Sequence, residues 1–348
     1  MKTRLVLLVC CALLTPIFSY AQLQRGTWLL DGSANWQTEL KKGVNNAVFS
    51  VYPLAGYAFS ERWLAGAQAG GQFTHSKNNT TAYEGSSLIF SPFVRYYITK
   101  PNPHFNYFLQ VRAGVNYTRS SFTQDFFGES DFSRRDYDLT TTLGFNYFIT
   151  PSQALEGRLG YIVILSDAKP IHSLGFTLEQ RCFLPNEKPT QPINDVFSPG
   201  DFLLHFDVTG TWHDIAGYNE YFLEFNPTIG YFIHPRWAVG TGLLMGFANQ
   251  NQILELSPFA RYYFGAQGTR FQPFATVSTS TRFQFADETS EPSFFNLDVN
   301  GGIGLDFFIT SNVALEGLLQ YNHYQIEDAI SNRQFLNFSL GFQFFIKN

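Results

Sequence analysis

Four charged residues could do chemistry together, because each half of the sequence carries the same pair in the same order. Arg95 lies in the motif SPFVRYY and Glu156 in ALEG, and Arg261 and Glu316 occupy the matching places in SPFARYY and a second ALEG. Such pairs can gate a pore or take part in proton transfer. A buried unpaired charge is costly, whereas a hydrogen-bonded pair is tolerated. We therefore expect a structural charge network that fills and stiffens an enclosed lumen.

The remaining candidates for catalysis are weaker. Asp31 and Asp207 are predicted at equivalent inward positions of the first strand in each half, and acid–base work by carboxylates needs a cleft and a perturbed pKa. The seven histidines are scattered, with no HxH or HExxH spacing for a metal. A Ser-His-Asp triad would have to be assembled by the fold. We predict no catalytic residue, no metal and no cofactor, so the protein is not expected to be an enzyme.

The composition and the hydropathy pattern predict membrane-spanning strands. The chain has 38 Phe and 18 Tyr but only 15% charged residues, and after the first residues it contains no apolar run of about 18 residues. Apolar and polar residues alternate instead. In residues 254–264, Leu254 and Leu256 fall on one face, and Glu255, Ser257 and Arg261 fall on the other. One face suits lipid and the other a polar interior, as in a transmembrane β-barrel.

An internal repeat organises the chain. GYAFSERWLAG returns as GYFIHPRWAVG, FITPSQALEG returns as FITSNVALEG, and SLGF occurs in both halves, always in the same order. Eight strands are predicted in the first half, at roughly 26–37, 46–59, 62–74, 86–99, 104–119, 137–149, 153–165 and 171–183. Eight more are predicted at roughly 200–212, 220–233, 236–248, 252–265, 270–285, 294–309, 312–326 and 333–347. Short and long connections alternate, as expected for periplasmic turns and outer loops.

Aromatic residues flank the short connections. Such rings bury in the acyl boundary while their polar edges stay hydrated, so they form a girdle at the membrane interface. The predicted girdle consists of Tyr57, Trp63, Tyr96, Tyr147, Tyr231, Trp237, Tyr262 and Phe307.

The segment between the halves favours two barrels over one. Residues 184–199 carry four prolines and little alternation, which is typical of a linker. Eight strands can close a barrel whose interior side chains just fill it, and would let Arg95 meet Glu156 across the lumen. We therefore predict an all-β fold with two tandem eight-stranded antiparallel up-and-down barrels, at 22–183 and 200–348. The alternative is one sixteen-stranded barrel.

The first residues have the layout of an export signal. Lys2 and Arg4 precede an apolar stretch, and Ser19-Tyr20-Ala21 provides a small-residue cleavage site, so residues 1–21 are predicted to be a signal peptide. Losing Lys2 and Arg4 changes the formal net charge from −5 to −7, which excludes electrostatic binding to nucleic acid.

The motifs PFVRYY, GYF…RWAVG, YFIT…NVALEG and the closing SLGF resemble the small outer-membrane β-barrel domains of Gram-negative bacteria, the OmpX- and OmpW-like proteins. The resemblance covers nearly all of residues 23–183 and 200–348. It implies a membrane barrel, exported through the periplasm to the bacterial outer membrane and inserted by the barrel assembly machinery. It also implies a lumen charge network of Arg95, Glu156, Arg261 and Glu316, and it carries no shared reaction.

The expected function is therefore an integral outer-membrane protein, in contact with outer-membrane lipids, with a structural or surface-binding role. The predicted loop 120–135, SSFTQDFFGESDFSRR, carries four Phe residues that could anchor an extracellular partner. The alternative is a porin-like channel or a transporter of small or hydrophobic compounds. A lipid-modifying enzyme is the lowest alternative.

Overall fold

The computed structural model describes residues 24–41, 44–77, 81–98, 104–124, 128–165, 170–186, 197–215, 218–249, 251–266, 268–286, 294–326 and 333–348. The predicted signal peptide lies outside these residues. In the described ranges, no helix is long and apolar enough to span a membrane. The strands of the first half are β1 (Trp28–Asp31), β2 (Ala34–Glu39), β3 (Asn45–Val51), β4 (Leu54–Ala58), β5 (Trp63–Lys77), β6 (Thr81–Tyr97), β7 (Phe105–Gln124), β8 (Gly128–Thr150), β9 (Gln153–Leu165) and β10 (Ile171–Leu184). Those of the second half are β11 (Phe202–Ile215), β12 (Tyr218–His234), β13 (Trp237–Ala248), β14 (Asn251–Tyr263), β15 (Phe271–Ala286), β16 (Phe294–Phe308), β17 (Val313–Ile326) and β18 (Arg333–Ile346).

The first two predicted strands are each broken into two segments. β1 and β2 are separated at Gly32, whose φ of 124° is open to glycine and strained for other residues. β3 and β4 are separated at Tyr52-Pro53, where the Tyr52 amide donates to the Ser33 carbonyl at 2.8 Å. β1 with β2, and β3 with β4, each make up one strand of the barrel. The eighteen described segments therefore form a sheet of sixteen antiparallel barrel strands, at positions that agree well with the predicted ones.

The prediction of two separate eight-stranded barrels was wrong. All the strands belong to one sheet, in which β10 pairs with β11 from His172↔Asp214 to Glu179↔Asp207. β18 pairs with β2 from Phe335↔Glu39 to Leu340↔Ala34 and so closes a single sixteen-stranded barrel, which was the alternative. The halves share a wall because β2 and β11 each pair with a strand of the other half.

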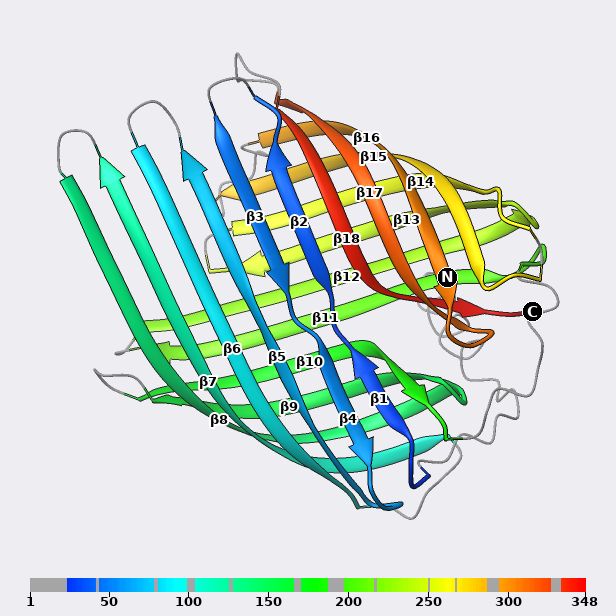
Figure 1. Cartoon of the computed structure of the whole chain (residues 1–348), viewed down its shortest axis with the longest axis horizontal. Helices are drawn as coiled ribbons and strands as arrows, with labels where there is room; N and C mark the ends of the chain where they lie inside the picture. Colours follow the sequence, from blue (N-terminus) through cyan, green and yellow to red (C-terminus); the bar gives the residue numbers. More distant parts are fainter. Residues whose placement is uncertain are drawn as a thin grey trace, which may run out of the picture.

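The barrel narrows toward the end that carries the turns between β8 and β9, between β12 and β13, and between β16 and β17. There β1 pairs with β10 through Trp28↔Leu184, Leu29↔Phe183 and Leu30↔Cys182, and β11 pairs with β18 over Phe202–Leu204. The first and last barrel strands of each half thus change partners along their length (Figure 1). These strands are β1 with β2, β10, β11 and β18. Between the narrowed ends, Cys182, Val313 and Phe344 form a buried apolar contact. One end of the barrel is wide and the other is pinched in the middle.

Side chains alternate across the wall as predicted. Leu88 and Phe90 of β6 lie outside with 50% and 51% exposure, whereas Ser91 and Arg95 are buried inside at 4% and 2%. The β14 face that carries Leu254 and Leu256 also lies outside. Period two thus gives an apolar exterior and a polar interior.

The predicted loop 120–135 is largely strand, so that prediction was wrong as well. β7 continues to Gln124 and β8 begins at Gly128, and the two strands pair to Gln124↔Gly128. Its charged composition suggested a loop, but a strand that projects past its neighbours can carry charges on both faces. Within the described residues, the last pair of β9 with β8 is Tyr137↔Leu165, and β8 begins nine residues before Tyr137, at Gly128.

The break between β1 and β2 gives a direct test of this architecture. A Cβ atom at Gly32 would lie 2.5 Å from the Tyr52 carbonyl oxygen, in addition to the strain of its positive φ. We expect Gly32→Ala to lower the free energy of unfolding by about 1–3 kcal/mol. Gly301→Ala is the matched control, because no heavy atom lies within 4 Å of the added methyl group. Urea unfolding followed by tryptophan fluorescence measures the free energy of unfolding of both variants. An equally small decrease in the two variants would contradict the break between β1 and β2.

Candidate functional site

Each half is filled at its narrow end by a floor of buried aromatic and aliphatic side chains. The first floor consists of Leu29, Ala58, Leu64, Phe93, Tyr97, Phe108, Phe148, Ala154 and Phe183. The second floor consists of Phe197, Leu203, Phe232, Ala238, Tyr263, Phe274, Phe308, Ala314 and Phe345. No member of either floor is more than 4% exposed. The narrow ends are therefore packed like a protein core.

A residue of the predicted linker completes the second floor. Residues 187–196 lie outside the described part of the chain, but Phe197 is inserted among the rings at the end of the barrel. Its ring centroid lies 4.3 Å from those of both Phe232 and Tyr263. Asp201 holds the neighbouring chain by accepting hydrogen bonds from the Ser198 and Asn348 amides, both at 2.9 Å. Phe197 fills the floor without being part of the wall.

The structure brings Arg95 and Glu156 together on top of the first floor. Arg95 Nη1 and Nη2 donate to the two Glu156 carboxylate oxygens at 2.6 and 3.0 Å, and the side chains are 2% and 0% exposed. Arg95 Nε donates to Gln110 Oε1 at 3.0 Å, and Asn146 Nδ2 donates to Glu156 at 2.7 Å. The guanidinium lies 3.8 Å from the centre of the Phe108 ring. This bidentate, hydrogen-bonded geometry is the kind that makes a buried ion pair tolerable.

Arg261 and Glu316 form the corresponding pair on the second floor. Arg261 Nη1 donates to Glu316 Oε2 at 2.5 Å, and the guanidinium lies 4.0 Å from the Phe274 ring centre. Tyr263 Oη donates to Asp306 Oδ2 at 3.0 Å. The pairs form in a sixteen-stranded barrel because each half curls toward itself at its narrow end.

The first half adds two arginines that the sequence analysis did not single out. Arg181 pairs with Asp31 and, at 2.5 Å, with Glu179, and its side chain is 3% exposed. Arg158 pairs with Glu179 and lies 3.5 Å from Glu156. Arg181 stands where β10 changes partner from β11 to β1, and no sequence motif marks that place. The last predicted member, Asp207, lies beside this network on β11, where its register partner is Glu179.

The second half has uncharged residues at the equivalent places. Leu318 follows Glu316 by two residues as Arg158 follows Glu156, and Gln343 pairs with Ala314 as Arg181 pairs with Ala154. Above the second floor lies a cavity of about 470 Å³, whereas the cavity lined by Arg112 and Arg158 in the first half has about 140 Å³. The first half is filled by ion pairs, and the second half keeps a pocket.

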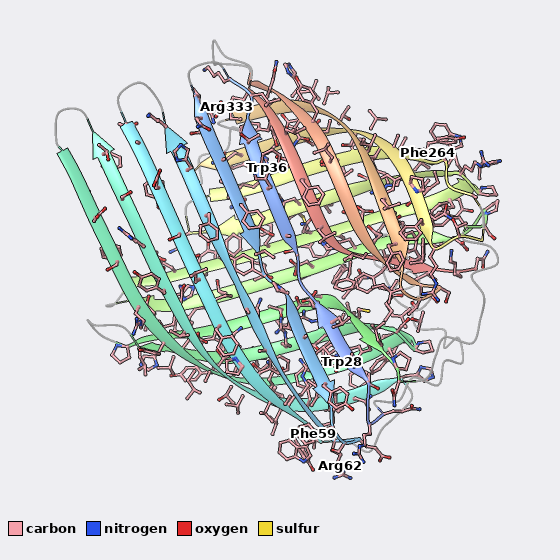
Figure 2. All side chains as sticks on the ribbon, viewed as in Figure 1. Trp28, Trp36, Phe59, Arg62, Phe264 and Arg333 are labelled. Atoms are coloured by element: carbon pink, nitrogen blue, oxygen red, sulfur yellow. The ribbon has the colours of Figure 1, made fainter. Side chains whose placement is uncertain are left out.

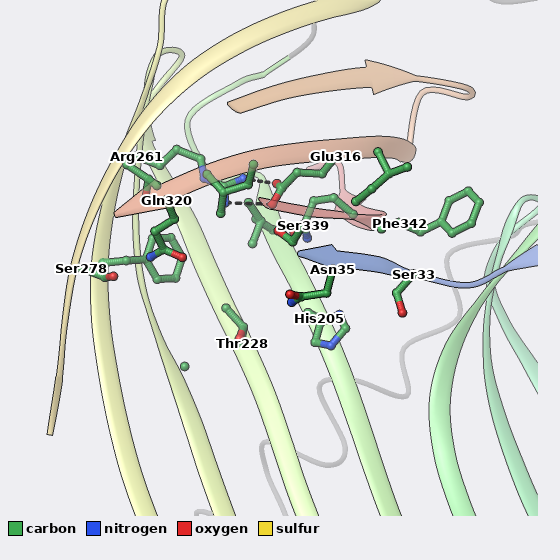
Figure 3. Close-up of a pocket in the computed structure, with 18 of the residues that line it drawn as sticks. Ser33, Asn35, His205, Thr228, Arg261, Ser278, Glu316, Gln320, Ser339 and Phe342 are labelled. Carbon is green, nitrogen blue, oxygen red and sulfur yellow. Dashed lines mark hydrogen bonds and ion pairs between the residues drawn. The ribbon is translucent and has the colours of Figure 1, made fainter. Parts of the chain in front are cut away.

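This pocket is the candidate functional site (Figure 3). Arg261 and Glu316 lie at its base, and His205 and Thr228 face it from β11 and β12. Ser33 and Asn35 come from the first half, because β2 pairs with β18 and places Asn35 opposite Ser339. The pocket thus depends on the single-barrel closure. A set of at least three His, Cys, Asp or Glu residues suited to a metal does not occur in the described ranges.

The predicted girdle residues lie on the outside, at the narrow end of the barrel. Tyr57 packs against Trp28, Trp63 against Tyr96, and Trp237 against Tyr262, with ring centroids 4.8–5.0 Å apart. Figure 2 shows Trp28 and Phe59 at this end of the molecule. The other predicted members pair in the same way: Tyr231 with Phe202, Phe307 with Phe271 and Tyr147 with Phe105.

Comparisons with known proteins find similarity in structure only. The sequence matches no protein-family model, and no relative was found among curated proteins. Similar solved structures include a bacterial polysaccharide outer membrane secretin, with 8% identity, a TM-score of 0.44, and coverage of 94% of this chain and 100% of that chain. The CymD monoaromatic hydrocarbon channel has 11% identity, a TM-score of 0.40, and coverage of 93% and 90%. OpdO of Pseudomonas aeruginosa has 10% identity, a TM-score of 0.40, and coverage of 93% and 98%. At these values no function is carried over.

The buried pair of the first half can be tested by removing one charge. Glu156→Gln leaves Arg95 buried beside two further arginines, so we expect the free energy of unfolding to fall by about 3–5 kcal/mol. The double variant Arg95→Met, Glu156→Gln should recover part of that loss. Asp131→Asn is the control, because Asp131 lies 3.9 Å from Arg119 with both side chains more than half exposed; its effect should stay below about 0.5 kcal/mol. Equal effects of Glu156→Gln and Asp131→Asn in urea unfolding would contradict the structural role of the pair.

Proposed function

We propose that the protein is an integral outer-membrane β-barrel that binds a solute in its lumen or a partner at its outer end, without catalysis and without a wide open pore. The apolar outer wall, with Leu88 and Phe90 about half exposed, supports solvation by acyl chains. The paired aromatic rings at one end support a membrane interface there.

The orientation follows from the ends of the strands. β1 begins and β18 ends at the narrow end of the barrel, where β10 also ends and β11 begins (Figure 1). In outer-membrane barrels with an even number of strands, the first strand begins and the last strand ends on the periplasmic side. The packed floors therefore face the periplasm, and the wide end with the pocket of the second half faces outward.

The observation that carries this proposal is that both floors are packed. A sixteen-stranded porin keeps an aqueous channel, whereas here the narrow ends hold fully buried rings under ion pairs. Arg95 is paired with Glu156, and Arg261 is paired with Glu316. This pairing supports a structural role over gating or acid–base catalysis. The contacts with outer-membrane lipids and with the barrel assembly machinery are part of the same proposal.

The projecting β7–β8 hairpin is the candidate surface for an extracellular partner. Residues 128–136 of β8 extend past the last β9 pair, and Phe132 in this segment is 55% exposed. In the part of the chain that the structure describes, this segment has no strand partner on the side of β9. Another chain can add a strand at such an edge, and the charges around Arg134 and Arg135 restrict which chain can do so.

Conductance in planar bilayers tests the closed floor. We expect the wild-type protein to pass little current, because aromatic side chains fill both narrow ends. Phe197→Ala removes a ring from the second floor without changing any strand, so the current should rise severalfold. Phe202→Ala is the control: it removes the same ring from the outer face, where Phe202 is 40% exposed, and should leave the current unchanged. A large steady current in the wild type, unaffected by Phe197→Ala, would favour the porin-like alternative and overturn the proposal.

A further inference from the structure

The pocket of the second half is lined by neutral hydrogen-bonding side chains together with apolar ones. The hydrogen-bonding side chains come from β2, β12, β14, β15, β17 and β18: Ser33 beside β2, Asn35, Thr228, Ser257, Thr276, Ser278, Gln320 and Ser339. The charges of Arg261 and Glu316 cancel in their bidentate contact. Figure 3 shows six of these side chains around one space beside the ion pair: Ser33, Asn35, Thr228, Ser278, Gln320 and Ser339. The lining offers many hydrogen bonds and no net charge apart from His205.

Further side-chain amides lie on the strands next to this lining. Asn337 lies opposite Gln320, and Asn300 lies opposite Ser278. The buried side-chain oxygens of Asn300 and Asn337 accept no hydrogen bond from any residue in the described ranges. An amide has two donors and an acceptor oxygen, and a hydroxyl group is both donor and acceptor, so the two match well. This wall has hydrogen-bonding capacity that the protein itself does not use.

The pocket also has an apolar side. Phe259 lines it and packs on the second floor, against Gly230 and Gly240, where an added Cβ would lie 3.0 and 2.6 Å from the Phe259 ring. Aromatic side chains provide large flat apolar surface. A ligand that carries many hydroxyl groups on its edge and C–H groups on its faces fits both kinds of surface.

We propose that this pocket binds a neutral carbohydrate of the size of a disaccharide. The volume of about 470 Å³ lies in the usual range for small-molecule sites. An anionic ligand would meet one guanidinium that Glu316 already neutralises, and an apolar ligand would leave the amides and hydroxyls unpaired. This inference rests on the proposed binding function and names its ligand class.

The two halves complete the site together. Ser33 and Asn35 reach the pocket only because β2 leaves the first half and pairs with β18. In the first half, the corresponding space is narrowed by Arg112 and Arg158 to about 140 Å³. The sugar site is therefore expected in the second half alone, with one ligand per chain.

Isothermal titration of the full-length protein in detergent tests this proposal. The neutral probes are maltose, lactose and sucrose, and the charged probes are glucosamine and glucuronate. We expect saturable binding of at least one neutral disaccharide, at least about tenfold tighter than either charged probe. Gln320→Ala should weaken that binding about tenfold, the effect of losing one good hydrogen bond. Gln72→Ala removes an amide from the inner wall of the first half and should leave binding unchanged.

Three outcomes overturn the carbohydrate site: no saturable binding of any neutral disaccharide, tighter binding of glucosamine or glucuronate, or equal weakening by Gln320→Ala and Gln72→Ala. Folding of each variant is checked by its unheated mobility on gels, so that a loss of binding is not a loss of structure. Absent sugar binding together with a low conductance overturns this inference alone. A high conductance overturns the proposed function itself.

Discussion

In the membrane location that we propose, every backbone N–H and C=O group of a strand must be paired with a neighbouring strand, and the structure depends on this constraint. A wall of strands therefore cannot have a free edge within the lipid. This chain meets the constraint in two ways at once. At the wide end β2 pairs with β18 and β10 pairs with β11, whereas at the narrow end β1 pairs with β10 and β11 pairs with β18. The first strand of the barrel is broken at Gly32, between the segment that pairs with β10 and the segment that pairs with β18.

This exchange of partners explains the two unlike ends of the lumen. Below the exchange, each half curls tightly enough for Arg95 to reach Glu156 and for Arg261 to reach Glu316, so aromatic floors and ion pairs fill the space. Above it, the halves share one interior, and residues of β2 line a pocket that belongs mostly to the second half. Arg158 and Arg181 fill the first half with further ion pairs, while Leu318 and Gln343 leave the second half open. The asymmetry between the halves is therefore a matter of a few side chains on a shared wall.

Much of this fold could be predicted because alternation and turns are local properties. The strand positions, the outward aromatic pairs such as Trp63 and Tyr96, and the inward direction of Arg95 all follow from period two. The closure could not be predicted, because partner choice depends on register between strands that are far apart in sequence. The meeting of Arg95 with Glu156 suggested a narrow barrel, and it does occur, but in the narrow end of a wide one. Arg181 carries no motif, since its importance comes from its place at the exchange.

Disulfide cross-linking of the seam measures the central claim most directly. In a Cys182→Ser background, Thr38→Cys with Leu336→Cys joins register partners of β2 and β18, which lie at a distance suitable for a disulfide. Extending the pairing Leu204↔Phe344 in register would place Trp212 opposite Leu336 if β11 and β18 paired along their whole length. A second double variant carries Trp212→Cys with Leu336→Cys. We predict that oxidation links the cysteines at 38 and 336 in the first variant and leaves those at 212 and 336 unlinked in the second. Efficient linkage at 212 and 336, with none at 38 and 336, would contradict the single barrel.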